Sequence, residues 1–430
     1  MRETRTGGRG RDFPHPKPVN KIELYAEHRR LRLILAVAFL VMGAFFIAYG
    51  VANLSSKKPG WSEIEVSSSE YNCSGDFVFL YCLGSGDISA TAENKALTAC
   101  YSDATEYAFQ MFTKDVAYEN VHNMYYINRH PNEELEVDDI LYQAFSLIQE
   151  SGNRSLYLAP VYEQYDGLFH CTEEYQAVEY DPYLNQNVAD YYAAITGFAN
   201  DTKMIDLELL GENRICLRVA DEYLAFAMEN EIESFIDFYW MKNAFIVDYM
   251  ADTMRANGFV QGSISSCDGF VRNLDDVSGT EYAFHIFSRN DAAIYPAGVM
   301  QYDGAMSIVC LRNYPVNNSL EGQYYYSFQN GEIRTAYIDA ADGYCKSAVN
   351  DLISYAQDSS CSEILLQVMP IYINDQFETE TLSRLTKDGI YSIYCQDNRI
   401  LYNESSLVLT DLYDENEIQY TAVYMVDSLK

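Results

Sequence analysis

The chain has 430 residues, of which 48% are hydrophobic, so it can form one large domain or two smaller ones with real cores. Its formal net charge of −34 argues against nucleic acid as a partner, because a phosphate backbone is neutralised by Lys and Arg. The charge is uneven: residues 1–32 hold nine Lys or Arg against four acids, and the remainder holds 20 basic and 59 acidic residues. A basic tail therefore precedes a strongly acidic body.

Residues 33–54 contain no charged side chain and predict a single transmembrane helix, since about twenty apolar residues span the hydrocarbon core. Arg29, Arg30 and Arg32 flank this run, so the positive-inside rule places the tail in the cytoplasm and the body outside the cell membrane. The alternative is a cleaved signal peptide, although the run is long for one and no clear cleavage site follows. The membrane is then one partner, and another extracytoplasmic protein is a second.

The remaining boundaries follow from composition. Residues 55–75 read as a juxtamembrane linker, 76–403 as the folded domain, and 404–430 as an extension packed on that domain. All ten cysteines lie beyond residue 54, and an even number on an oxidising side permits disulfides. We expect at least two of these cysteines to be bridged, and their spacing specifies no connectivity.

Apolar spacing of three and four residues predicts helices over 92–112, 138–149 and 243–257. Asp138 is a candidate N-cap, whereas Gly152 and Gly258 are candidate helix stops. Further helices are predicted over 346–357 and 361–367. Strands are predicted at 76–84 and in short alternating runs from residue 282 onward, with turns at Asp303-Gly304 and Asn330-Gly331. Helices and strands mix without strict alternation, which favours the α+β class.

Five segments, in this order, resemble the FAD:protein FMN transferase (ApbE-like) family: 111–130, 135–153, 236–269, 321–328 and 334–344. In "IDFYWMKNAFIVD" the matches to the family's I-D-L-G-G-I-A-K-G-Y-A-V-D are Ile236, Asp237, Val247 and Asp248, and Lys242 lies one place from the family lysine. Tyr324 falls on the tyrosine of the family's S-G-D-Y. The resemblance implies an ApbE-like α+β fold in which residues 236–269 form a central strand–helix–strand.

The resemblance also implies a chemistry, in which Mg²⁺ polarises the pyrophosphate of FAD while FMN moves to a Thr or Ser of a target protein. It gives Asp237, Lys242 and Tyr324 as cofactor-binding candidates. Asp237 is equally well explained as an ordinary turn residue. The family's metal ligands, an Asp and a Thr four residues apart, fall on Glu363 and Gln367, which still offer two oxygens on one helical face. The alternative for this pair is a solvated polar face.

The sequence departs from the family pattern at the positions that would carry the family's chemistry. Tyr239 and Trp240 replace a glycine pair that lets backbone approach the pyrophosphate, and the second glycine pair is Asp268-Gly269 at best. The histidine before the family's I-I-D-P falls on Ala336. Three hypotheses follow: a non-catalytic binding or scaffolding relative, which these departures favour; an active transferase that uses FAD and Mg²⁺ in a diverged site; and an adhesion or receptor domain for which the resemblance is misleading.

Overall fold

The computed structural model describes residues 57–67, 71–86, 88–275, 279–290, 293–316, 323–415 and 417–425. The chain divides into two units, Met1–Ser56 and Lys57–Lys430, and only the second contains described residues. No helix among the described residues is long and apolar enough to cross a membrane. The predicted tail at 1–32 and the predicted span at 33–54 lie outside the described residues.

A nine-stranded sheet runs through this unit, in the order β1-β2-β6-β7-β10-β13-β14-β15-β19. Neighbouring strands are antiparallel, except that β15 and β19 are parallel. The first strand lies inside the predicted linker at 55–75, and the last lies in the predicted extension. The strands are β1 (Gly60–Glu63), β2 (Phe77–Leu83), β6 (Gly262–Ser266), β7 (Phe270–Asn273), β10 (Ser307–Arg312), β13 (Asp351–Ala356), β14 (Tyr391–Gln396), β15 (Arg399–Tyr402) and β19 (Thr421–Tyr424).

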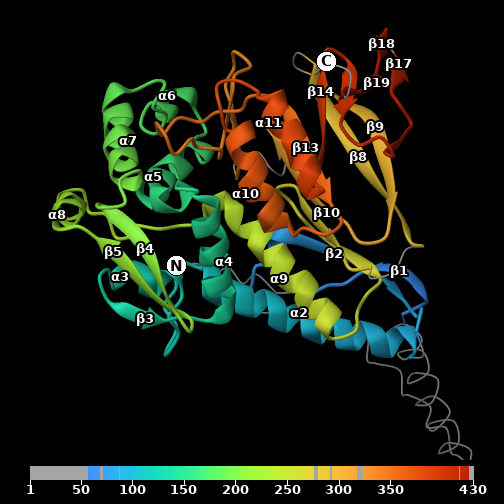
Figure 1. Cartoon of the computed structure of the whole chain (residues 1–430), viewed down its shortest axis with the longest axis horizontal. Helices are drawn as coiled ribbons and strands as arrows, with labels where there is room; N and C mark the ends of the chain where they lie inside the picture. The colour runs from blue at the N-terminus through green and yellow to red at the C-terminus, as the bar shows by residue number, and fades with distance from the viewer. Residues whose placement is uncertain are drawn as a thin grey trace, which may run out of the picture. The chain divides into compact units, whose positions relative to one another are not determined.

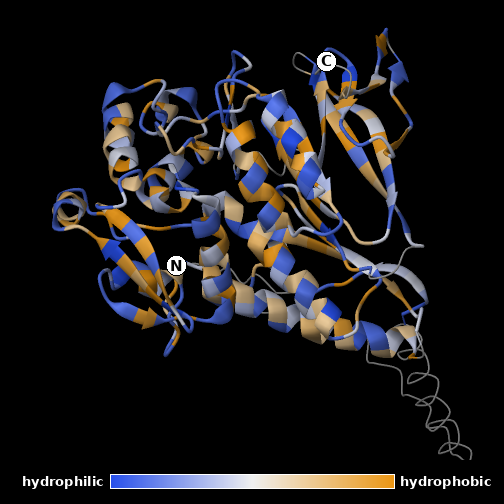
Figure 2. Ribbon diagram, in the orientation of Figure 1, coloured by the Kyte–Doolittle hydropathy of each residue, from blue (hydrophilic) through white to orange (hydrophobic). Residues whose placement is uncertain are grey.

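Helices cover one face of this sheet, and a small sheet covers part of the other (Figure 1). On the helical face, α2 (Ala90–Phe112) packs against α9 (Lys242–Ala256), which lies on β6 and β7, while α10 (Cys361–Tyr372) lies on β10 and β13. The second face is covered by β8 (Glu281–Asn290), β9 (Ala293–Asp303) and β16 (Val408–Thr410). In Figure 2, hydrophobic and hydrophilic residues alternate along α2, α9 and α10, as expected for helices with one face on a core.

A second group of elements lies beside α4 (Asp139–Ser151) and contains a three-stranded sheet ordered β3-β5-β4 (Figure 1). Its elements are α3 (Met124–Arg129), β3 (Glu134–Glu136), α5 (Ala159–Phe169), α6 (Glu174–Ala177), α7 (Gln186–Ala199), β4 (Ile205–Gly211), β5 (Arg214–Val219) and α8 (Asp221–Glu229). Short 3₁₀ turns aside, the described residues also form two short hairpins and one helix: β11 (Tyr325–Ser327), β12 (Ile333–Thr335), β17 (Asp414–Glu415), β18 (Ile418–Gln419) and α11 (Thr379–Arg384).

The three longer predicted helices are confirmed as α2, α4 and α9, and the helix predicted at 361–367 is confirmed as the start of α10. The boundaries of α4 show why the predicted N-cap and helix stop were reliable. The Asp138 side chain accepts the N–H of Ile140, which satisfies a backbone donor at the helix start. Gly152 ends the helix with φ of 68°, the left-handed conformation that glycine adopts without steric cost.

The predicted helix over 346–357 is wrong, because the structure places β13 there. Every residue of this strand is buried. Leu352 contributes to the core beneath the helices and Ile353 to the core beneath the small sheet, so both faces of the strand are covered. A strand buried on both faces shows no apolar alternation, and its continuous apolar run is easily mistaken for a helix.

The first element of the predicted strand–helix–strand at 236–269 is also wrong. Ile236 lies in an irregular segment, and Asn128 provides the hydrogen bonds that a partner strand would supply. The Asn128 side-chain oxygen accepts the N–H groups of Phe235 and Ile236, at 2.8 and 2.9 Å, and its Nδ2 donates to the carbonyl of Ile236 at 2.9 Å. A short 3₁₀ turn (Tyr239–Met241) then leads into α9, and β6 follows as predicted.

The prediction that at least two cysteines are bridged is not met: all ten thiols, each in the described part of the chain, are free. Five of them are buried within the folded unit: Cys73, Cys216, Cys310, Cys361 and Cys395. They behave there as small apolar side chains, which is a common role for free cysteine. The large core therefore holds the unit together without disulfides.

Candidate functional site

The turn that precedes α9 has the backbone of a glycine turn but carries a tyrosine. Tyr239 has φ of 48°, in the left-handed region that costs a non-glycine residue about 1–2 kcal/mol. Its N–H donates to the Oδ1 atom of Asp237 at 2.9 Å, which holds the turn in place. The resemblance places the first glycine of the family's I-D-L-G-G at this position. The conformation is therefore that of a glycine, while the side chain is not.

Two aromatic rings fill the space at this turn. The Tyr239 ring stacks on Tyr162, with centroids 4.6 Å apart, and its hydroxyl donates to Asp166 at 3.3 Å. Trp240 is 3% exposed and packs edge-on against Tyr337, with centroids 4.8 Å apart. A ligand that needs close contact with the backbone here would have to displace both rings.

An alanine variant is usually more stable than a glycine variant at the same position, and we expect the strain at Tyr239 to reverse that order. Both Tyr239→Gly and Tyr239→Ala lose the ring stacked on Tyr162, but only alanine keeps the left-handed penalty. Tyr239→Gly should therefore be the more stable by about 1 kcal/mol in urea unfolding.

At Tyr142, inside α4, the same pair of substitutions should give the opposite order, because glycine costs about 1 kcal/mol in a helix. An alanine variant at Tyr239 as stable as the glycine variant would show that the turn is not strained.

Polar groups gather at the start of α9, where Asn243 occupies the position of the family lysine. Its Nδ2 donates to the Oδ2 atom of Asp268 at 3.0 Å. Burial raises the pKa of Asp268 to about 7, and the nearby Asp76 adds to this rise, while hydrogen bonds from Ser266 and Asn243 oppose it. Asp268 stands where the resemblance places a glycine of the second pair. Carboxylates therefore lie where close backbone approach to a phosphate was expected.

A cavity of about 380 Å³ opens beside this turn, between the end of α2, α5 and the start of α9; we call it the α9 cavity. Asp237 and Lys242, two of the cofactor-binding candidates, both line it. Asp237 is 7% exposed, and burial raises its pKa, while the Tyr239 N–H, Lys114 and Lys242 oppose the rise. Burial also raises the pKa of Tyr324, whose charged and aromatic neighbours include Asp268 and Tyr239. Two of the three cofactor-binding candidates thus line one cavity, and Tyr324 is not among the residues that line it.

The predicted metal pair, Glu363 and Gln367, is on α10, and the Glu363 carboxylate caps the start of that helix. Glu363 and Ser360 form a capping box: the Glu363 carboxylate accepts the N–H of Ser360 at 2.7 Å, and the Ser360 hydroxyl accepts the N–H of Glu363 at 3.2 Å. Gln367, one turn further along the helix, is exposed. Within the described ranges, no three His, Cys, Asp or Glu side chains are grouped so that they could hold a metal ion.

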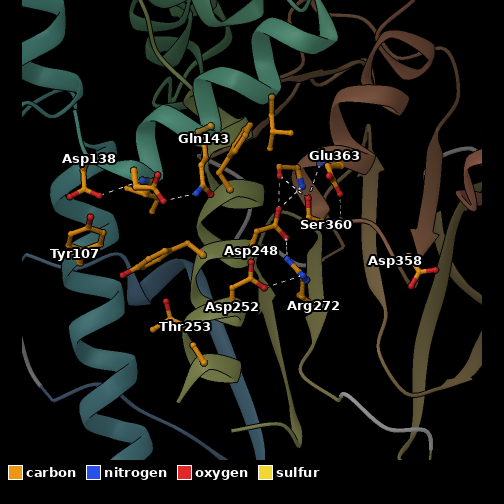
Figure 3. A pocket seen from close by; sticks show the side chains of 18 residues that line it. Tyr107, Asp138, Gln143, Asp248, Asp252, Thr253, Arg272, Asp358, Ser360 and Glu363 are labelled. Carbon is orange, nitrogen blue, oxygen red and sulfur yellow. Dashed lines mark hydrogen bonds and ion pairs between the residues drawn. The ribbon is translucent and has the colours of Figure 1, made fainter. Parts of the chain in front are cut away.

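Sequence reasoning missed the role of Asp248, which joins α9 to α10 (Figure 3). Its carboxylate accepts the N–H groups of Cys361 and Ser362 at 2.9 and 2.8 Å, and the Ser362 hydroxyl at 2.7 Å. Arg272 on β7 completes the junction with an ion pair to Asp248 at 2.8 Å and another to Asp252 at 3.2 Å. The one available signal was that Asp248 matches the final Asp of the family motif. A cavity of about 590 Å³ lies against this junction.

No protein-family model and no curated protein sequence matches the chain. Among solved structures, the ApbE protein of Thermotoga maritima superposes with a TM-score of 0.53 at 11% identity, over 82% of this chain and 97% of that one. The chain has the ApbE fold. A variant of the flavin transferase ApbE from Vibrio cholerae superposes with a TM-score of 0.49 at 12% identity, over 80% of this chain and 97% of that one. At the level of the fold, the superposition on the Thermotoga maritima protein agrees with the resemblance read from the sequence.

Proposed function

We propose that this chain is a non-catalytic relative of the FAD:protein FMN transferases, which uses the ApbE fold as a binding or scaffolding module. One observation carries the proposal: Tyr239 holds the backbone conformation of a glycine while its ring, stacked on Tyr162, fills the space above that backbone. Trp240 fills the neighbouring position from within the core. A pyrophosphate has no route to the backbone at this turn unless both rings move.

The charges at the start of α9 support the same conclusion. Asp76, Asp237 and Asp268 lie near the start of α9, and their negative charges oppose a pyrophosphate, which brings negative charge and no positive charge to offset it. Ala336, which is 1% exposed, replaces the family histidine with a side chain that cannot donate or accept a proton. FAD with Mg²⁺ does not fit this set of residues, and Glu363, the acidic member of the predicted metal pair, already caps α10.

The second candidate is an active transferase with a diverged site, and Lys242 favours it. This residue lies one place from the family lysine and lines the α9 cavity. Its backbone N–H donates to the Tyr239 carbonyl, while its side chain forms no ion pair or hydrogen bond within the described part of the chain. An unpaired cation next to Asp237 is a feature that a phosphate-binding enzyme would retain.

Covalent transfer separates the two candidates. The purified full-length chain, incubated with FAD, Mg²⁺ and a flavin-acceptor protein, is expected to leave the acceptor's mass unchanged. An active ApbE run in parallel shows that the acceptor is competent. An acceptor that gains the mass of FMN in the presence of this chain would establish the active transferase instead.

We further propose that residues 33–54 anchor the chain in the cell membrane, with residues 1–32 in the cytoplasm and the acidic body outside. The support is the uncharged run and the basic flank described from the sequence. Protease added to intact cells is expected to digest the body and spare the tail, as detected with antibodies to each part. A body that stays intact until the cells are lysed would contradict this topology.

A further inference from the structure

The α9 cavity contains two opposite charges that are not paired with each other. Asp237 and Lys242 both line it, and each influences the other electrostatically. Neither forms an ion pair with any residue in the described ranges, and Asp237 accepts one hydrogen bond from them, from the Tyr239 N–H to Oδ1. Its Oδ2 atom accepts none from those residues. The cavity thus presents one carboxylate oxygen without a hydrogen-bond donor from those residues. It also presents the Lys242 ammonium group, which acts electrostatically on both Asp237 and Asp76 and forms no ion pair with either.

The other charged groups in this cavity are already engaged or lie at its exposed edge. Lys114 pairs with Asp115 at 2.8 Å. Asp166 accepts the Tyr239 hydroxyl and lies 3.3 Å from His170. Glu163 is exposed at the rim. Asp237, at 7% exposure, is therefore the buried acid that still has an oxygen to offer.

A buried charge without a partner is costly, because the protein interior solvates it poorly. That cost falls on Asp237, because Lys242 is half-buried and reached by water, and no ion pair joins the two side chains in the described ranges. A ligand that carries an ammonium group and a carboxylate group on neighbouring atoms would satisfy both at once. The rest of the lining adds a second requirement, since Phe109, Phe112 and Ile246 give the cavity an apolar wall.

We propose that the α9 cavity binds a zwitterionic α-amino acid with an apolar side chain, its ammonium group at Asp237 and its carboxylate at Lys242. The volume of about 380 Å³ lies within the usual range for small-molecule sites. This inference rests on the proposed function, because it assigns to the cavity a ligand other than FAD. It makes the module a sensor or carrier of small amino acids rather than a transferase.

The test uses L-phenylalanine as the probe, with isothermal titration calorimetry on the purified full-length chain. Phenethylamine lacks the carboxylate and 3-phenylpropionate lacks the ammonium group, while both keep the ring. L-phenylalanine is expected to bind at least about tenfold more tightly than either, because each of them leaves one protein charge unpaired.

Two variants test the two contacts separately. Asp237→Asn keeps an oxygen for the Tyr239 N–H, so the turn is retained, and Lys242→Met keeps most of the lysine's apolar stem. Each is expected to weaken L-phenylalanine binding about tenfold to a hundredfold. Lys203→Met, at an exposed lysine outside the cavity lining, should leave binding unchanged. Circular dichroism confirms that each variant is folded.

Two results would overturn the inference. The first is that L-phenylalanine does not bind the folded wild-type chain, which means that solvent alone bridges the two charges. The second is that all three probes bind equally tightly. Its failure is distinct from failure of the proposed function. Covalent FMN transfer overturns the proposed function whatever the amino acid does, whereas no transfer combined with no amino acid binding overturns only the inference made here.

Discussion

Replacing Asp248 by alanine is expected to lower the free energy of unfolding by about 3–5 kcal/mol, since the change breaks a buried ion pair from one side. The Arg272 guanidinium, with its side chain 13% exposed, loses its main partner. The N–H groups of Cys361 and Ser362 lose their acceptor, so the start of α10 is left with unsatisfied donors. Urea unfolding followed by circular dichroism measures the loss.

Asp252 provides the matched control, because it lies one turn further along α9 and also contacts Arg272. Its side chain is 64% exposed, so water replaces it when it is removed. Asp252→Ala should cost no more than about 1 kcal/mol. Equal losses for the two alanine variants would mean that the Asp248 junction adds nothing beyond a surface ion pair.

Trp240→Ala is expected to cost about 3–5 kcal/mol, because the change removes a large buried ring and leaves a cavity against Tyr337. The chain has two tryptophans, and the other, Trp61, is 52% exposed on the edge strand β1. Trp61→Ala should therefore cost less than about 1 kcal/mol. Thermal unfolding of the three proteins gives the comparison.

The Trp240 result bears directly on function. A large loss of stability in Trp240→Ala means that this ring is part of the core. The space beside the α9 turn is then filled in the native state. If Trp240→Ala were as stable as the wild-type protein, the ring would be dispensable, and a ligand could displace it at little cost.

Local signals predicted those elements that are stabilised by nearby residues. The helix α4 was found because its N-cap, its apolar stripe and its stop all lie within fifteen consecutive residues, Asp138 to Gly152. The strand β13 was missed because both of its faces are buried, which removes the alternation that identifies a strand. The resemblance implied a strand at Ile236, and nothing in the sequence indicated that Asn128, 108 residues away, holds this segment in an irregular conformation.

The sequence named candidate residues for the site but could not give their geometry. The sequence drew attention to Asp237 and Lys242, and the structure brings them to one cavity. It could not show that Tyr239 takes the left-handed conformation, because the chain gives no signal of φ at a tyrosine. The Asp248 junction was missed for a related reason, since its partners on α10 are more than a hundred residues away.

The most direct test of the account is the affinity of the purified full-length chain for FAD in the presence of Mg²⁺. Quenching of flavin fluorescence during titration measures it, and an active ApbE provides the positive control. The filled turn at Tyr239 and Trp240 and the carboxylates around it predict no saturable quenching at micromolar concentrations of protein. Saturable binding in the micromolar range, abolished by removing Mg²⁺, would contradict the claim that this ApbE fold no longer holds the flavin nucleotide.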